Sequence, residues 1–107
     1  MALVEVSIIP IGTGNPSLSR YVARAVEILR SEKDIRYELT AMGTIIEGDL
    51  ARVMTLVKRM HDAVFDTGVM RVVTMVKIDE RRDKASSLTS KLESLKRELG
   101  HNWMPEK

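Results

Sequence analysis

The sequence of 107 residues contains no cysteine, and its aromatic content is only 4%. The lack of cysteine excludes disulfides, thiolate metal ligands and a thiol nucleophile, and it agrees with a reducing compartment. The scarcity of aromatic residues weighs against a sheet that binds RNA by stacking bases on exposed rings. We therefore expect a protein that does not bind nucleic acid.

Long apolar runs are also missing. No stretch approaches the roughly 20 apolar residues that a helix needs to span a bilayer. Near the N-terminus, Glu5, Ser7 and Pro10 interrupt the apolar residues, and no basic region precedes them as it does in a signal peptide. These features predict a cytoplasmic protein that does not bind a membrane.

Length and charge indicate an ordinary globular domain. The 17 basic and 15 acidic residues leave a net charge of +2, so no strong field of one sign is present. A chain of this length with 44% hydrophobic residues has room for one modest core. We expect a single domain over residues 1–107, in which about 100–107 form a loosely ordered tail.

The first half of the sequence predicts a strand followed by a helix. Residues 2–9 alternate apolar and polar side chains, as in a strand with one buried face. From about 16 to 31 the apolar residues recur at helical spacing. Asn15 before Pro16 fits an N-cap followed by proline at the first helical position.

The second half repeats this order with one more strand. Alternating residues from Ile35 to Ala41 predict a strand, and a turn at Met42 and Gly43 leads into a short strand over 44–47. Asp49 is the expected N-cap of a second helix that ends near Gly68. The apolar stripe expected on this helix consists of Leu50, Val53, Met54, Val57, Met60, His61 and Val64.

The C-terminal part predicts a fourth strand and a third helix. Residues 70–79 have a strand pattern, with Val72, Thr74, Val76 and Ile78 on one face. Beyond the charged stretch that follows, four leucines spaced by four and three residues mark a helix: Leu88, Leu92, Leu95 and Leu99. This narrow stripe is too short to form a coiled coil alone and needs a surface to pack against.

The element order βαββαβ predicts an α+β fold of the ferredoxin-like class, with an extra C-terminal helix. Two helices would cover one face of a four-stranded antiparallel sheet. The other face would carry a mixed set of side chains: Glu5, Ser7, Ile9, Arg36, Glu38, Thr40, Arg71, Val73, Met75 and Lys77. Because this face is too apolar in places to be merely solvated, we expect a homo-oligomer.

Several segments resemble one known family. They are Ile8 to Gly14 running into Ser17, Ser19, Tyr21 and Val22, then Met42 to Gly48, Arg71 to Thr74 and Lys77 to Asp83. Together they span nearly the whole chain and resemble the thiamine-binding, MTH1187/YkoF-like family (UPF0045). The resemblance implies a ligand-binding module rather than an enzyme, and a tetramer built as a dimer of dimers. It also makes inter-subunit salt bridges of Arg81 or Arg82 plausible.

The glycine-containing loop after the first strand allows three interpretations. Gly12-Thr13-Gly14 lacks the lysine of a phosphate loop and the third glycine of a dinucleotide fingerprint, so a nucleotide site is a weak interpretation. A tight turn between strand and helix is the simpler one. The resemblance implies that this loop borders a ligand pocket, with polar contacts available from Thr13, Asn15, Ser17 and Ser19.

The segment from Thr44 to Gly48 holds the main charged candidate. The Glu47 carboxylate can be a surface group, or it can accept a hydrogen bond from the amino group of a cationic aminopyrimidine and oppose its charge. Thr44 lies beside it in the same segment. Tyr37 can offer a ring face to the same cation, although strand alternation favours a core position for it.

Other chemical sites are weakly indicated. His61 shares the apolar stripe of its helix, so we interpret it as a packed side chain, and no His cluster suggests a metal ion. We predict no catalytic residues, metal or cofactor. The leading hypothesis is a cytoplasmic protein that binds thiamine or a related hydroxymethylpyrimidine compound without turnover. The alternatives are an oligomeric regulatory or scaffold protein that senses another metabolite, and an enzyme with weakly marked acid–base residues.

Overall fold

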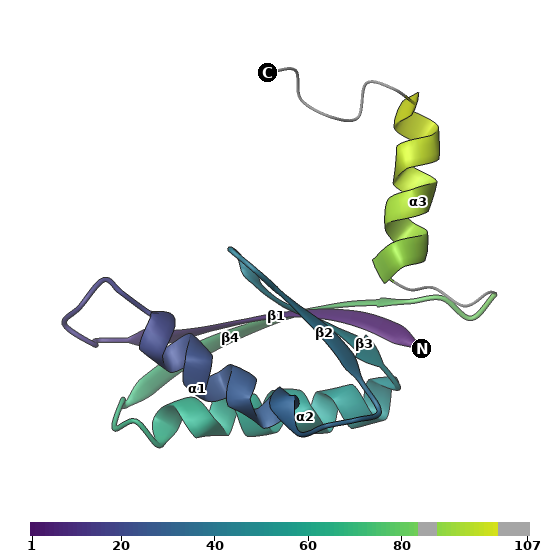
Figure 1. Cartoon of the computed structure of the whole chain (residues 1–107). Coiled ribbons are helices and arrows are strands. Elements are labelled where there is room, and N and C mark those ends of the chain that lie inside the picture. The colour runs from purple at the N-terminus through teal and green to yellow at the C-terminus, as the bar shows by residue number, and fades with distance from the viewer. Residues whose placement is uncertain (84–87, 101–107) are drawn as a thin grey trace.

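The computed structural model describes residues 1–83 and 88–100 and has an α+β fold (Figure 1). The elements are β1 (Ala2–Ile11), α1 (Ser19–Arg30), β2 (Arg36–Thr40), β3 (Gly43–Gly48), α2 (Leu50–Phe65), β4 (Arg71–Glu80) and α3 (Leu88–Leu99). All neighbouring strands are antiparallel, in the order β2-β3-β1-β4. This confirms the ferredoxin-like βαββαβ arrangement with an additional C-terminal helix. The tail expected after Gly100 lies outside the described residues.

The two central strands carry the apolar core. Val4 and Val6 of β1 and Ile46 of β3 are at most 2% exposed, and α1 and α2 cover this face of the sheet (Figure 1). The alternation of β1 thus points Val4, Val6 and Ile8 towards the helices, as its sequence predicts. Coverage weakens at the edge strand β4, where Val76 is 39% and Ile78 46% exposed.

Helix α2 supplies the largest share of the buried helical side chains. Its predicted N-cap is confirmed, because the Asp49 carboxylate accepts a hydrogen bond from the backbone N–H of Arg52 at 3.2 Å. Its buried residues are Val53, Leu56, Val57, Met60, Ala63 and Val64. The predicted stripe was wrong in including Met54, which is exposed, and in omitting Leu56, which is buried. The buried side of α2 is rotated about the helix axis from the side that the sequence pattern indicated.

The predicted start of α1 is wrong. The helix begins at Ser19, and Leu18 occupies the N-cap position without a side-chain hydrogen bond. The Asn15 side chain instead accepts a hydrogen bond from the backbone N–H of Ser17 at 2.9 Å. Such a local turn satisfies the asparagine within the loop, so Pro16 precedes the helix rather than starting it.

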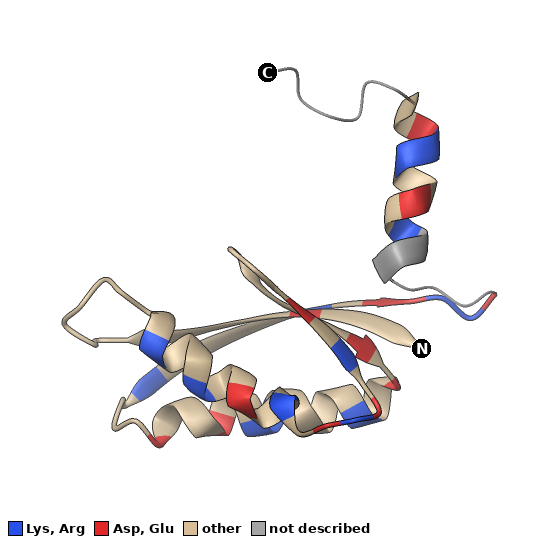
Figure 2. Cartoon of the chain, viewed as in Figure 1, with Lys and Arg blue, Asp and Glu red and all other residues tan. Residues whose placement is uncertain are grey.

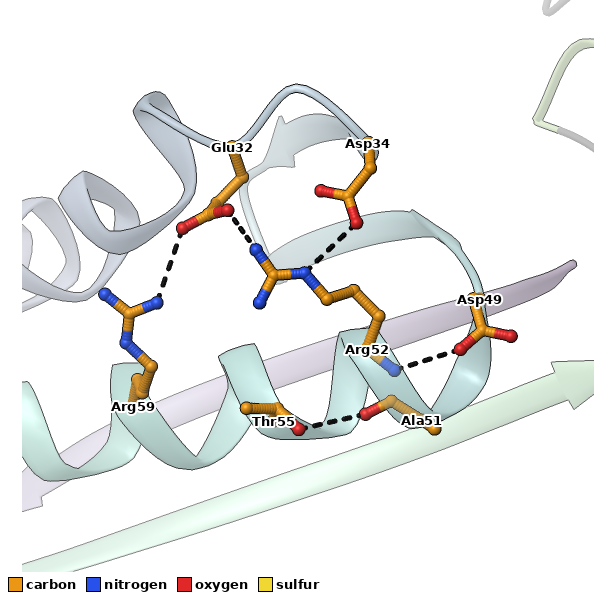
Figure 3. A network of polar contacts seen from close by, with 7 residues as sticks. All are labelled: Glu32, Asp34, Asp49, Ala51, Arg52, Thr55 and Arg59. Atoms are coloured by element: carbon orange, nitrogen blue, oxygen red, sulfur yellow. Dashed lines mark hydrogen bonds and ion pairs between the residues drawn. The ribbon is translucent and has the colours of Figure 1, made fainter.

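An ion-pair network joins α2 to the connection between α1 and β2 (Figure 3). Arg52 pairs with Glu32 and also donates to Asp34 at 3.1 Å. Arg59 reaches the other oxygen of Glu32 at 3.3 Å. Since the Glu32 side chain is only 16% exposed, this network holds the end of α1 firmly against α2.

Helix α3 stands on the side of the sheet opposite α1 and α2 (Figure 1). Lys91 pairs with Asp79 of β4, and Leu92, Leu95 and Leu99 are each about half exposed. These three leucines of the stripe therefore remain largely uncovered within the described part of the chain. No helix within residues 1–83 and 88–100 is long and apolar enough to cross a membrane.

Candidate functional site

A cleft of about 770 Å³ lies between α1, the middle of β1 and the β2–β3 hairpin. Its walls are mainly aliphatic, with side chains from both helices and three strands: Val6, Ile8, Leu18, Val22, Val26, Leu39, Met42 and Met60. Pockets of this size and lining suit small organic molecules, which are bound by apolar surface and oriented by a few polar groups.

The polar groups of the cleft come from the start of α1, its later turns and the hairpin. The polar residues of the lining are Ser7, Ser19, Glu27, Arg30, Thr40 and Thr44, of which the strand register directs the Ser7 and Thr40 side chains to the other face of the sheet. Thr44 is only 4% exposed, so its hydroxyl sits deep beside the apolar walls. Glu27 pairs weakly with Arg24 at 3.5 Å, and both side chains are about half exposed. The cleft thus offers the hydroxyl groups of Ser19 and Thr44, together with the Glu27 carboxylate and the Arg30 guanidinium on the α1 wall.

The hairpin wall is shaped by Thr40 and Gly43. The Thr40 hydroxyl donates to the Gly43 carbonyl at 2.8 Å and accepts from the backbone N–H groups of Met42 and Gly43 at 3.2 and 3.1 Å. A Cβ at Gly43 would lie 2.7 Å from the Val6 carbonyl oxygen, so only glycine permits this close approach to β1. Met42, which is 82% exposed, is thereby held at the tip of the hairpin beside the cleft.

The loop between β1 and α1 carries no charged residue (Figure 2). The Thr13 hydroxyl donates to the Asn15 carbonyl at 2.8 Å, and the Ser17 and Ser19 hydroxyls are 3.4 Å apart. Ser19 lines the cleft, whereas Thr13, Asn15 and Ser17 do not. Gly12 and Gly14 have φ of +79° and +72°, which glycine adopts without strain.

The two remaining candidates lie outside the cleft. Glu47 is cross-strand from Leu3 near the start of β1, while the β1–α1 loop follows Ile11, about 26 Å further along a strand that rises roughly 3.3 Å per residue. Its side chain points to the face that α1 and α2 leave open. Tyr37 is 36% exposed, so its interpretation as a core residue is wrong: it lies on edge strand β2, beyond the cover of the helices.

Of the predicted site residues, the structure therefore brings Ser19 and Thr44 together at one cleft. Sequence reasoning missed its apolar walls and Glu27. The sequence did contain a signal for the walls, namely the helical spacing of Leu18, Val22 and Val26, but we interpreted these side chains as part of the core.

The other polar candidates have local roles. His61 Nδ1 lies 2.6 Å from the Thr74 hydroxyl, and its ring meets Phe65 edge-on at 5.3 Å, which confirms a packed histidine. The side-chain hydrogen bond to Asp83 raises the pKa of Arg81, which therefore stays cationic. Within the described ranges, no group of three His, Asp or Glu residues is placed to hold a metal ion.

Comparison with known proteins identifies the family. The family model described as thiamine-binding protein matches residues 4–96. The UPF0045 protein YqgV of Bacillus subtilis is 46% identical over 102 residues, covering 92% of this chain and 98% of its own. A UPF0045 protein of Methanothermobacter thermautotrophicus is 46% identical over 100 residues, covering 92% of this chain and all of the relative.

A solved structure agrees with the fold. Protein MJ1052 of Methanocaldococcus jannaschii superposes with a TM-score of 0.80 at 41% identity, over 88% of this chain and 94% of that protein. With this architecture, a cleft suited to a small molecule and a family match over most of the sequence, the chain belongs to the thiamine-binding protein family, UPF0045.

Proposed function

We propose that the protein binds thiamine or a related hydroxymethylpyrimidine compound in the cleft beside α1, without chemical turnover. The observation that carries the proposal is the size and lining of this cleft, which combines aliphatic walls with hydroxyl groups, one carboxylate and one guanidinium. The description of the family as thiamine-binding supports the choice of ligand.

The chemistry of the ligand matches these groups. Thiamine has two flat rings that gain from apolar walls, and the hydroxyls of Ser19 and Thr44 can exchange hydrogen bonds with its aminopyrimidine. Glu27 opposes the permanent positive charge of the thiazolium. Its exposed ion pair with Arg24 is weak and can be given up for a ligand. In this arrangement, Thr13, Asn15 and Ser17 shape the loop that leads into Ser19.

The proposal includes a homo-oligomer, a tetramer built as a dimer of dimers, that works in the cytoplasm. Its support is the apolar surface on the open side of the sheet. Met75 of β4 is 57% exposed, and Leu92 and Leu95 of α3 are 53% and 54% exposed. A second copy that covers these side chains would remove their apolar area from water.

Filling the cleft tests the proposal directly. Ala23 lines the cleft and is exposed, so Ala23→Phe adds a ring there without disturbing the core. We expect calorimetric titration to show thiamine binding to the wild type and an affinity loss of more than about tenfold in Ala23→Phe. Ala51→Phe, at an exposed position of α2 that does not line the cleft, is the matched control and should bind as the wild type does.

Thr44→Val sharpens the test within the cleft. The substitution keeps the shape of the side chain and removes its hydroxyl, so we expect a loss of roughly two- to tenfold in affinity. Native mass spectrometry of protein purified from cells identifies a retained ligand independently. A retained metabolite other than a pyrimidine, together with no thiamine binding by the wild type, would favour a sensor of that metabolite instead.

A further inference from the structure

The cleft contains one charged group that free thiamine does not use. Arg30, at the end of α1, lines the cleft and is exposed. Its guanidinium takes part in no ion pair or hydrogen bond within residues 1–83 and 88–100. The five N–H donors of this group therefore have no acceptor in the described chain, and they suit an anion rather than a cation.

The helix dipole explains a basic residue at the end of α1 but not its place in the cleft. A cation in the last turn interacts favourably with the negative end of a helix. That benefit depends on the distance from the helix end and not on the side of the helix that carries the charge. It therefore does not account for a guanidinium that lines the cleft.

Glu27 lies one helical turn before Arg30 on the same wall. Residues three apart in a helix are neighbours, with Cβ atoms about 5–6 Å from each other. Within the described residues Glu27 nevertheless pairs with Arg24, at a long 3.5 Å, and not with Arg30. The wall thus presents a negative and a positive charge side by side, and neither neutralises the other.

Thr44 adds an unfilled hydrogen-bonding position to the cleft. It is only 4% exposed and lies cross-strand from the buried Val6, on the side of the sheet that faces the helices. Its hydroxyl has no hydrogen-bond partner within the described residues. Because a buried hydroxyl without a partner is costly, a ligand group that completes it contributes to binding. The cleft therefore combines one deep hydroxyl with two opposite charges on its α1 wall.

A ligand that matches all three groups has a polar ring, a cation and an anion. Thiamine supplies the first two, in its aminopyrimidine and its thiazolium. Its hydroxyethyl group, on the thiazolium, supplies the third only when it is esterified. A phosphate monoester carries a charge of about −1.5 to −2 near pH 7. Arginine binds such a group through two parallel hydrogen bonds, which are stronger than bonds between neutral groups.

We propose that the cleft selects the phosphate monoester of thiamine over thiamine itself, with Arg30 binding the phosphate and Glu27 opposing the thiazolium. The inference rests on the proposed function and deepens it by naming the charged form of the ligand. It makes Arg30 a specificity-determining residue. Without the phosphate, its positive charge opposes the thiazolium and weakens binding.

Calorimetric titrations with thiamine and with thiamine monophosphate test the proposal. The quantity compared is the ratio of the two dissociation constants. At low ionic strength we expect the wild type to bind the monophosphate roughly five- to thirtyfold more tightly, because the phosphate adds charge-assisted hydrogen bonds. The ratio should fall at high salt, since Arg30 is exposed and its charge is screened there.

Variants of α1 assign this preference to one side chain. Arg30→Met keeps an apolar stem and removes the charge, so the ratio should fall to about one or below. Arg30→Lys keeps the charge without the planar fork and should retain part of the preference. Arg20→Met is the matched control: it removes the same charge from an exposed position of α1 that does not line the cleft, and it should keep the wild-type ratio. Circular dichroism checks the fold of each variant.

The outcomes separate this inference from the proposed function. Equal binding of the two ligands by the wild type, or a preference that survives Arg30→Met, would overturn the inference and leave thiamine binding in the cleft intact. Binding of the monophosphate alone, lost in Arg30→Met, supports the inference and restricts the proposed function to the phosphorylated ligand. If the wild type binds neither, the preference does not exist, and titration with hydroxymethylpyrimidine decides separately whether the proposed function stands.

Discussion

The two faces of the sheet differ in how completely one chain accounts for them. On the helix-covered face, apolar side chains of β1 and β3 are buried by α1 and α2, and the polar network of Figure 3 is satisfied within the chain. On the open face, one oxygen of the buried Glu47 carboxylate has no hydrogen-bond partner among the residues that the structure describes, and large apolar side chains are exposed. The first face is therefore completed by the chain itself, whereas the second leaves large apolar side chains in contact with water.

Adjacent isoleucines of β3 offer the strongest test of this difference. Ile46 is fully buried on the covered face, and Ile45 is half-buried on the open face. We expect Ile46→Ala to lower the free energy of unfolding by about 2–5 kcal/mol, since it removes core contacts and leaves a cavity. Ile45→Ala should lower it by less than half as much in urea denaturation at the same low protein concentration. Equal losses would mean that the two faces are equally covered within one chain.

Gly43 tests the packing of the hairpin against β1. Gly43→Ala would place a methyl group against the backbone of Val6, which cannot move without disturbing the sheet. We expect a loss of about 1–3 kcal/mol in stability, measured by thermal denaturation, together with weaker thiamine binding.

Gly48→Ala is the comparison for that measurement. A Cβ there would meet the side-chain methyl groups of Ile35 and Val53 at 3.0 and 3.1 Å, and these can shift by a few tenths of an ångström. Its loss should be the smaller of the two. A larger loss at Gly48 would show that the helix side, not the hairpin, is the more tightly packed.

The ion-pair network on the covered side should give the smallest effect. Arg52→Met removes two pairs with Glu32 and Asp34, so we expect a loss of about 1 kcal/mol that shrinks at high salt. Lys58→Met breaks a single exposed pair with Asp62 on the same helix and should cost less than about 0.5 kcal/mol. Denaturation of both variants at low and high salt makes the comparison, and a salt-independent loss at Arg52 would point to packing instead of charge.

Sequence periodicity predicted most of the fold because strands and helices each repeat a buried position at a fixed interval. It found the four strands, the cap at Asp49 and the separation of the two faces. It failed at α1, where Asn15 was satisfied by a loop turn that competes with capping. It also failed at Tyr37, because alternation shows which way a side chain points but not whether a helix extends over it.

The site was less predictable than the fold. Polar residues near the β1–α1 loop suggested a pocket there, and Ser19 does line the cleft. The aliphatic walls could not be distinguished from core, because a cleft wall and a core stripe have the same pattern until the neighbouring element is placed. Glu47 was singled out by its segment, but only the strand register shows that it lies on the face opposite the cleft.

The central place of β1 also governs when this protein can fold. Its residue Ala2 is opposite Gly48 on one side and Glu80 on the other, so the first strand to leave the ribosome pairs with two that are made much later. Contacts so distant along the chain slow folding, because a long loop must close before they form. Until β4 has been synthesised, β1 leaves an apolar edge exposed, and the nascent chain is at its most vulnerable to aggregation during that interval.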